Sequence, residues 1–144
     1  MPLRTYNPKK VVVVIGGFPM GGWADGQFLN ISRATDAYTK HVGAGGDTSR
    51  AKSNDRSGEA TLTFAQTSPS NDVLSGFATA DEISDTGVVS FTVKDLSGRS
   101  TYVSGFAWIR KVPDGTFDKE ITDREWILDL TDLDVFTGGN LQAE

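Results

Sequence analysis

The order of apolar and polar residues along the chain predicts a fold made mainly of strands. Val11–Ile15 is a continuous apolar run that ends at two glycines, which is typical of a strand covered on both faces. Glu59–Ala65 alternates strictly, with Leu62 and Phe64 on one side and threonines on the other. Similar but less regular patterns predict strands in five more places: Gln27–Arg33, Ala37–Val42, Val89–Val93, Arg99–Val112 and Glu125–Phe136.

One segment changes from the period of a strand to that of a helix. Ser68–Asp72 supplies capping side chains and an early proline, which are signals of a helix start. Apolar residues then recur at helical spacing: Val73, Leu74, Phe77 and Ala80. The sequence therefore predicts one amphipathic helix over about residues 70–83, packed over a sheet face or a barrel mouth.

The last two predicted strands carry unusual patterns. Arg99–Val112 is apolar on both faces, so we expect one face to meet the core and the other to meet a neighbouring subunit. In Glu125–Phe136 the apolar residues change sides after Thr131. That switch predicts a bulge, or a strand that leaves one sheet for another.

Together these elements indicate a mainly β fold, an antiparallel β-sandwich or barrel with one packed helix, because strands and helices do not alternate. A length of 144 residues fits one domain. We expect that domain to span residues 1–144, with its core at about 9–136 and a loose C-terminal tail at 137–144.

A polar stretch interrupts the strands at about residues 43–58. It holds four glycines, three serines and five charged residues, so none of it can enter a core. We expect a long loop or a hairpin extension. A flexible surface loop and a functional element are both compatible with this composition, since structureless loops of more than about 12–15 residues are uncommon in compact domains.

Composition removes most enzyme classes. The chain has no cysteine and a single histidine, His41, which excludes disulfides, thiolate metal sites and cysteine nucleophiles and leaves no material for multi-histidine centres. The densest carboxylates are Asp129, Asp132 and Asp134, and their spacing is not that of an EF-hand. The sequence indicates neither catalysis nor a cofactor.

Charge is distributed unevenly. Residues 1–113 carry a net charge of +2 and residues 114–144 a net charge of −7. Such an acidic segment disfavours binding to nucleic acid, because lysine and arginine supply most of the affinity for phosphates. The longest strongly apolar run, Val11–Ile15, is far shorter than the ~20 residues of a membrane helix, so we expect a soluble intracellular protein.

The order of several segments resembles phage tail-tube proteins of the contractile-tail type. The resemblance rests on Ala24–Leu29 and Asp36–Gly43, and is closest at Gly58–Asp72, where a strand runs directly into the helix start. It covers roughly Val11 to Val135 and depends on the order and spacing of the segments.

The resemblance implies a structural subunit that forms six-fold rings stacked into a hollow tube. The implied location is the tail of the virion, after assembly in the host cytoplasm, with DNA passing through the tube without specific binding and no membrane involved. Implied partners are further copies of the chain and the sheath, baseplate or initiator, tape-measure and tail-terminator proteins. The polar stretch would reach an adjacent subunit or ring through Asp47, Arg50, Lys52, Asp55 and Arg56. Asp129, Asp132 and Asp134 would make the lumen acidic and repel phosphates.

Three other functions stay open at the level of sequence. The first is the tube of a phage-tail-like bacteriocin or secretion machine. The second is a monomeric carbohydrate-binding β-sandwich, in which Trp23, Trp108 and Trp126 would stack on sugars instead of filling a core or an interface. The third is a small hydrolase that uses two carboxylates.

Overall fold

The computed structural model describes residues 3–140 and confirms a mainly antiparallel β fold with one packed α-helix. A short 3₁₀ turn at Pro8–Lys10 precedes the first strand. The elements that follow are β1 (Val11–Ile15), β2 (Phe18–Pro19), β3 (Leu29–Arg33), β4 (Tyr38–Val42), β5 (Thr48–Lys52), β6 (Gly58–Ala65), α1 (Ser70–Ser84), β7 (Val89–Asp95), β8 (Thr101–Lys111), β9 (Asp123–Leu130) and β10 (Asp134–Phe136).

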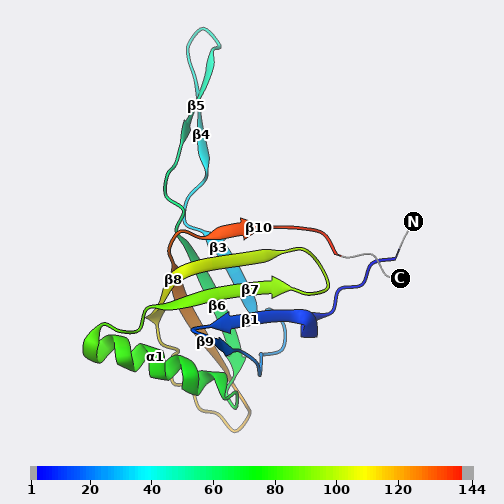
Figure 1. The fold of residues 1–144 in the computed structure, drawn as a ribbon, viewed down its shortest axis with the longest axis vertical. Coiled ribbons are helices and arrows are strands. Elements are labelled where there is room, and N and C mark those ends of the chain that lie inside the picture. The colour runs from blue at the N-terminus through cyan, green and yellow to red at the C-terminus, as the bar shows by residue number, and fades with distance from the viewer. Residues whose placement is uncertain (1–2, 141–144) are drawn as a thin grey trace.

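Eight of the strands form one open sheet that folds over to resemble a sandwich. Its order is β2-β1-β7-β8-β9-β6-β3, and β10 pairs with β8 outside this path. In Figure 1, β1, β7, β8 and β10 lie across the front of the molecule, while β6 and β9 run behind them at an angle. The fold therefore places two layers of one sheet against each other, with edges at β2 and β3.

The core lies between these layers. Strand β6 has a neighbour on both edges, and its burial alternates perfectly, so that Leu62 and Phe64 are fully buried. Val13, Ile15 and Phe91 come from β1 and β7 and belong to the same apolar cluster. Strict alternation in the sequence thus corresponds to a strand with one face in the core.

The first strand departs from its prediction on one face. Val13 and Ile15 are buried, but Val12 and Val14 on the opposite face are only half-buried. On β8, Phe106 is 68% exposed, whereas Tyr102 and Trp108 of the same parity are half-buried, so that face of the strand is covered only in part within the chain. An apolar run in the sequence cannot distinguish burial in the chain's own core from burial in an interface.

Helix α1 matches the predicted span of residues 70–83 to within one residue, but it starts differently from the prediction. Leu74 is fully buried and Phe77 packs against the core cluster. Pro69 occupies the N-cap position and provides no side-chain cap itself, but the Ser68 hydroxyl accepts the amide of Ser70 at 3.2 Å. Ser68 and Ser70 also donate their hydroxyls to the Gly21 carbonyl, at 2.6 and 3.0 Å, and so attach the helix start to the β2–β3 connection.

The switch of apolar side in the last strand marks a real break in the chain. Strand β9 ends at Leu130, and β10 pairs with the first part of β8 while β9 pairs with its second part. Between them, Asp132 adopts a left-handed backbone with φ of +43°. We call residues 131–133 the corner. The prediction was a bulge or a strand that leaves one sheet for another; β9 and β10 instead belong to the same sheet, and the change of side marks the break between two strands that pair with different parts of β8.

The polar stretch predicted at residues 43–58 is only part of the projecting element. Strands β4 and β5 pair with each other in a separate two-stranded sheet, so the segment predicted as an independent strand at Ala37–Val42 is one arm of a hairpin. This hairpin stands away from the sandwich at one end of the molecule (Figure 1). The boundary was missed because both arms carry polar residues without a clear alternation.

The C-terminal segment contacts the body over its described part. The backbone amide of Arg99 donates to the Gly139 carbonyl at 3.0 Å, and Gly98 forms a bridge with Asn140. The remainder of the expected tail, residues 141–144, lies outside the described residues. Within residues 3–140, no helix is long and apolar enough to cross a membrane.

Candidate assembly site

The hairpin formed by β4 and β5, residues 38–52, has no core of its own. All ten residues of its two strands are exposed. Its turn is closed by the amide of Gly43, which donates to the Asp47 carbonyl at 2.8 Å, and by a left-handed Gly46 with φ of +91°. An isolated two-stranded hairpin is marginally stable in water. Such an element is expected to gain stability from a surface that it binds.

The side chains of the hairpin are basic with apolar residues among them. Lys40, Arg50 and Lys52 outweigh Asp47, which gives residues 38–52 a net charge of +2. The guanidinium carbon of Arg50 lies 4.2 Å from the centre of the Tyr38 ring, a cation–π contact across the two strands. The hairpin can therefore offer charge and exposed apolar area to a partner together.

Two short legs connect the hairpin to the sandwich: residues 33–37, which begin with the last residue of β3, and residues 53–57, which lead into β6. The legs hydrogen-bond to each other at both ends. The amide of Ser53 donates to the Ala37 carbonyl at 2.8 Å, and the amide of Ala34 donates to the Ser57 carbonyl at 3.1 Å. These hydrogen bonds hold the two legs side by side, so the legs are not two independent loop segments.

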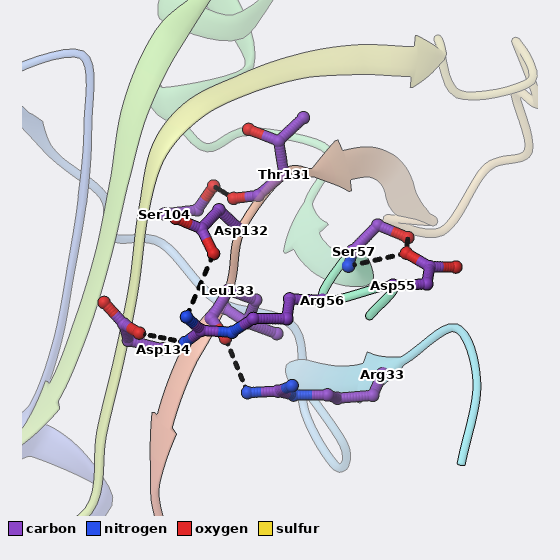
Figure 2. A network of polar contacts seen from close by, with 9 residues as sticks. All are labelled: Arg33, Asp55, Arg56, Ser57, Ser104, Thr131, Asp132, Leu133 and Asp134. Atoms are coloured by element: carbon purple, nitrogen blue, oxygen red, sulfur yellow. Dashed lines mark hydrogen bonds and ion pairs between the residues drawn. The ribbon is translucent and has the colours of Figure 1, made fainter. Parts of the chain in front are cut away.

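Both legs are attached to the corner between β9 and β10 (Figure 2). From the first leg, Arg33 donates through Nη2 to the carbonyl of Leu133 at 2.6 Å. From the second leg, the carbonyl of Arg56 accepts the amide of Leu133 at 2.8 Å. The backbone of Leu133 is thus bonded to both legs, and its side chain is fully buried.

Ion pairs reinforce the attachment from the second leg. Arg56 reaches Asp132 at 3.2 Å and also pairs with Asp134, so one guanidinium spans the two sides of the corner. The side chain of Arg56 is 48% exposed. Pairs this exposed typically contribute less than about 1 kcal/mol to stability each. Their effect is therefore better described as orienting the leg than as stabilising the fold.

Close packing fixes the same junction. Gly58 is the first residue of β6, and a Cβ at this position would lie 2.7 Å from Cδ2 of Leu133 and 2.7 Å from the Ser32 carbonyl oxygen. No real side chain fits that space without movement of the backbone. Glycine is required here by close approach of neighbouring atoms.

Asp55 orders the second leg locally. Its carboxylate accepts the hydroxyl of Ser57 at 2.6 Å and the amide of Ser57 at 3.0 Å. These two hydrogen bonds, the side-chain one first, hold the pKa of Asp55 below its ordinary value, because they favour the charged form. The leg is turned so that the next residue, Arg56, reaches the corner (Figure 2).

The structure separates the residues predicted for intersubunit contact. Asp47, Arg50 and Lys52 belong to the hairpin or its turn. Asp55 and Arg56 belong to the second leg, and the Arg56 guanidinium is engaged by aspartates of its own chain. Arg56 therefore links the second leg to the corner within its own chain.

The three aspartates predicted for an acidic lumen are also separated. Asp132 lies in the corner, Asp134 is the first residue of β10, and both pair with Arg56. Asp129 lies on β9 and accepts from Arg110 at 3.3 Å and from the Trp108 indole at 3.2 Å. Each carboxylate thus has an arginine partner. Among residues 3–140, no three acidic or histidine side chains are grouped as a metal ion would require.

Sequence reasoning missed Arg33 and Leu133, which hold the hairpin to the body. The change of apolar side after Thr131 was the available signal, because it placed Leu133 on the opposite parity from Leu130. Nothing in the sequence paired Leu133 with Arg33, one hundred residues away. The three tryptophans likewise do not form one platform, since Trp126 is buried and Trp23 stacks on Phe64 at 4.5 Å between ring centres.

Known proteins resemble this chain in sequence and in fold. A curated relative, structural protein ORF10 of Pseudomonas phage KPP10, is 33% identical, and the match covers 94% of this chain and 83% of the relative. Two solved structures have a similar fold with TM-scores of 0.64. They are the tube-terminating cap of the anti-feeding prophage, at 10% identity over 94% of this chain and 93% of that chain, and a sheath-tube complex of the PVC extracellular contractile injection system, at 13% identity over 92% and 91%.

A family model assigns the chain more specifically. The model of the bacteriophage PhiTE tail tube protein matches residues 10–138, nearly all of the described sandwich, hairpin and helix. This family consists of structural virion proteins and not of enzymes. The chain belongs to the PhiTE family of phage tail-tube proteins.

Proposed function

We propose that this tail-tube subunit forms six-fold rings, and that the rings stack into the hollow conduit through which a phage genome leaves the capsid. The tube would stand in the virion tail inside a contractile sheath and be assembled in the host cytoplasm. The observation that carries this proposal is the fully exposed hairpin 38–52 on an anchored base, in a chain of the tail-tube family. A projecting element of this kind is suited to reach another copy.

The proposal includes the partners expected of such a tube: a sheath, a baseplate or other initiator, a tape-measure protein and a terminator. The similar solved structures come from a sheath-tube complex and from caps that terminate tubes, which supports a sheath and a terminator. The 33% identical relative is a phage protein, and it favours a phage tail over a bacteriocin or secretion machine.

We retain the proposal of an acidic lumen, but we no longer attribute its charge to three aspartates alone. Asp129, Asp132 and Asp134 are each paired with an arginine, so their charges are partly cancelled at short range. Repulsion of DNA phosphates would rest on the net charge of −7 carried by residues 114–144 as a whole. Replacing Asp129 alone with asparagine, which leaves the Arg56 pairs intact, should then slow ejection only slightly, and an unchanged bore charge in the assembled tube would remove Asp129 from the lumen.

The hairpin's role is tested by removing it without disturbing its base. Ala37 and Ser53 are already joined by a backbone hydrogen bond, so residues 38–52 can be replaced by an Asn-Gly turn that closes the legs. We expect a folded monomer, with unchanged circular dichroism, that makes neither rings nor tubes in negative-stain electron microscopy at concentrations where the unaltered chain does. The matched control is Glu82→Lys on the exposed side of α1. Normal tubes from the hairpin-deleted chain would contradict the hairpin's role as the joint, and an unaltered chain that makes neither rings nor tubes would contradict the tube function itself.

A further inference from the structure

The end of the molecule opposite the hairpin carries a second surface suited to binding. Residues 112–122, here called the end loop, connect β8 to β9. Figure 1 shows the hairpin and the end loop at opposite ends of the longest axis. A groove of about 370 Å³ lies between the end loop and the start of α1; its lining includes Val112, Pro113, Phe117, Asn71, Ser75 and Trp126.

The end loop exposes three large apolar side chains to solvent. Phe117 is 80% exposed, Ile121 is 68% exposed and Val112 is 54% exposed, all within eleven residues. A single exposed apolar side chain is ordinary, but a group of three beside a groove marks an interaction site. These side chains would lose contact with water only if another molecule covered them.

The end loop is held in place within the chain. The Thr116 carbonyl accepts from Thr122 and from Arg124, both at 2.9 Å. The guanidinium of Arg124 lies 5.2 Å from the centre of the Phe117 ring, and the Gln66 side chain accepts the amide of Thr122 at 3.1 Å. A binding partner would therefore meet a preformed surface and lose little affinity to ordering the loop.

The charges of the two ends are complementary. Residues 112–122 carry Asp114, Asp118 and Glu120 against Lys119, a net charge of −2, and the hairpin carries +2. All four charged residues of the end loop are exposed. Opposite potentials favour the docking of one end on the other, and like charges disfavour contact between two hairpins or two end loops.

We propose that the end loop and its groove are the docking site for the hairpin of a second copy of this chain. Tyr38 and Val42 would cover the apolar residues of the groove, and Lys40, Arg50 and Lys52 would approach Asp118 and Glu120. Because the two surfaces lie at opposite ends, the contact is head-to-tail, and every assembly of docked copies keeps a free hairpin at one end and a free groove at the other. Such a contact extends without limit, as a tube requires. The inference rests on the proposed function, in which the hairpin is the joint between copies.

Charge exchange between the two ends tests the pairing. Arg50→Glu with Lys52→Glu reverses the hairpin, and Asp118→Lys with Glu120→Lys reverses the end loop. We expect each double variant to reduce tube yield at least ten-fold in negative-stain images and sedimentation. The chain with all four substitutions should regain tubes, because the net charges of the two surfaces are again opposite, −2 on the hairpin and +2 on the end loop. Asp25→Lys with Glu82→Lys is the matched control, with both residues exposed and outside the hairpin and the end loop.

The outcomes separate this inference from the proposed function. If the unaltered chain forms neither rings nor tubes, the proposed function fails. If the hairpin-deleted chain still forms tubes, the hairpin is not the joint, and this inference fails while the tube function stands. If the hairpin variants lose tubes while the end-loop variant assembles like the unaltered chain, the hairpin docks elsewhere and only this inference fails. Failure of the four-substitution chain to regain assembly also overturns the inference.

Cross-linking gives a direct measurement that does not need long tubes. The chain has no cysteine, so paired cysteines can be introduced without background disulfides. Val42→Cys with Phe117→Cys should yield a ladder of disulfide-linked multimers when concentrated protein is oxidised. Val42→Cys with Glu82→Cys, the matched control, should yield little beyond dimers. Equal ladders from both pairs, or none from the first, would overturn the assignment of the groove.

Discussion

Strand β6 and the hairpin strands β4 and β5 are all regular antiparallel strands, yet their surroundings are opposite. Along β6 every second residue is buried, because β3 and β9 pair with its two edges and its inner face meets the core. Along β4 and β5 every residue is exposed. Backbone pairing alone is therefore compatible with either situation. The difference shows that the body of this subunit is stabilised by its own core, whereas the hairpin depends on its anchored base and, in our proposal, on a second copy.

The largest expected effect on stability comes from removing a buried side chain of β6 and leaving a cavity in the core. Phe64 is fully buried and stacks on Trp23, so Phe64→Ala should lower the free energy of unfolding by about 3–5 kcal/mol. The hairpin control, Tyr38→Ala, should change that free energy by less than about 1 kcal/mol because it removes only an exposed contact. Urea unfolding of the monomers measures both. Similar losses in the two variants would show that the hairpin is part of the stabilised body.

A somewhat smaller effect is expected where the two regions meet. Gly58→Ala places a Cβ against Leu133 and the Ser32 carbonyl, and should lower the free energy of unfolding by about 1–3 kcal/mol through overpacking. Gly45→Ala in the hairpin turn is the matched control, since a Cβ there meets no atom within 4 Å. Thermal unfolding followed by circular dichroism compares them. If Gly58→Ala left the free energy of unfolding unchanged, the atoms around the corner would move aside at little cost, and the corner would not hold the legs in a fixed position.

The ion pairs of the corner should affect assembly more than stability. Arg56→Gln is expected to lower the free energy of unfolding by less than about 1 kcal/mol, because the pairs are half exposed. It should nevertheless reduce tube formation, since the leg loses its lateral attachment and the hairpin its fixed direction. Arg110→Gln is the matched control: it breaks pairs with Glu59 of β6 and Asp129 of β9, neither of which belongs to a leg or to the corner. The positioning role is refuted if both variants assemble equally well.

The smallest effect concerns the pH dependence of the second leg. The hydrogen bonds from Ser57 lower the pKa of Asp55 in the folded chain, so they stabilise the leg above the ordinary aspartate pKa of about 3.9. That contribution is lost as the pH falls through the lowered pKa of the folded state. Ser57→Ala should raise the pKa of Asp55 toward its ordinary value in a carboxyl-detected NMR titration.

The control for this titration is Ser53→Ala, which removes a different hydroxyl of the same leg. Ser53 accepts the amide of Asp55 but does not touch its carboxylate. The pKa of Asp55 should therefore stay low in this variant. If Ser53→Ala raised it as much as Ser57→Ala, general loosening of the leg would explain the shift instead of the hydrogen bonds.

Much of the fold could be predicted from the sequence because the relevant signals are local. The alternation of Glu59–Ala65 and the helical spacing of Val73, Leu74 and Phe77 report which face of an element meets the core. The apolar residues change from one face of the strand to the other after Thr131, and this switch located the corner. The left-handed backbone at Asp132 turns the chain there, so the residues that follow no longer continue the alternation of β9. The hairpin was identified only as a polar insertion, since exposed strands have no apolar alternation to reveal them.

The candidate site was harder to predict from the sequence than the fold, because its residues are far apart along the chain. Arg50 and Lys52 could be chosen as exposed charges of a polar segment, and Asp132 and Asp134 as a dense acidic group. That Arg56 joins these two sets follows only from the folded chain, in which the second leg crosses the corner. The groove beside the end loop was not predicted at all.

The sequence by itself determined the elements, the fold class and the exclusion of cysteine- and histidine-based chemistry, because residue type and spacing act within a few positions of each other. Only the tertiary structure decided where these elements point. It joined Arg33 and Arg56 to Leu133 across 100 and 77 residues of chain, and it placed a basic hairpin and an acidic loop at opposite ends. Such juxtapositions depend on how the whole sheet twists and folds over, a property of all its strands together.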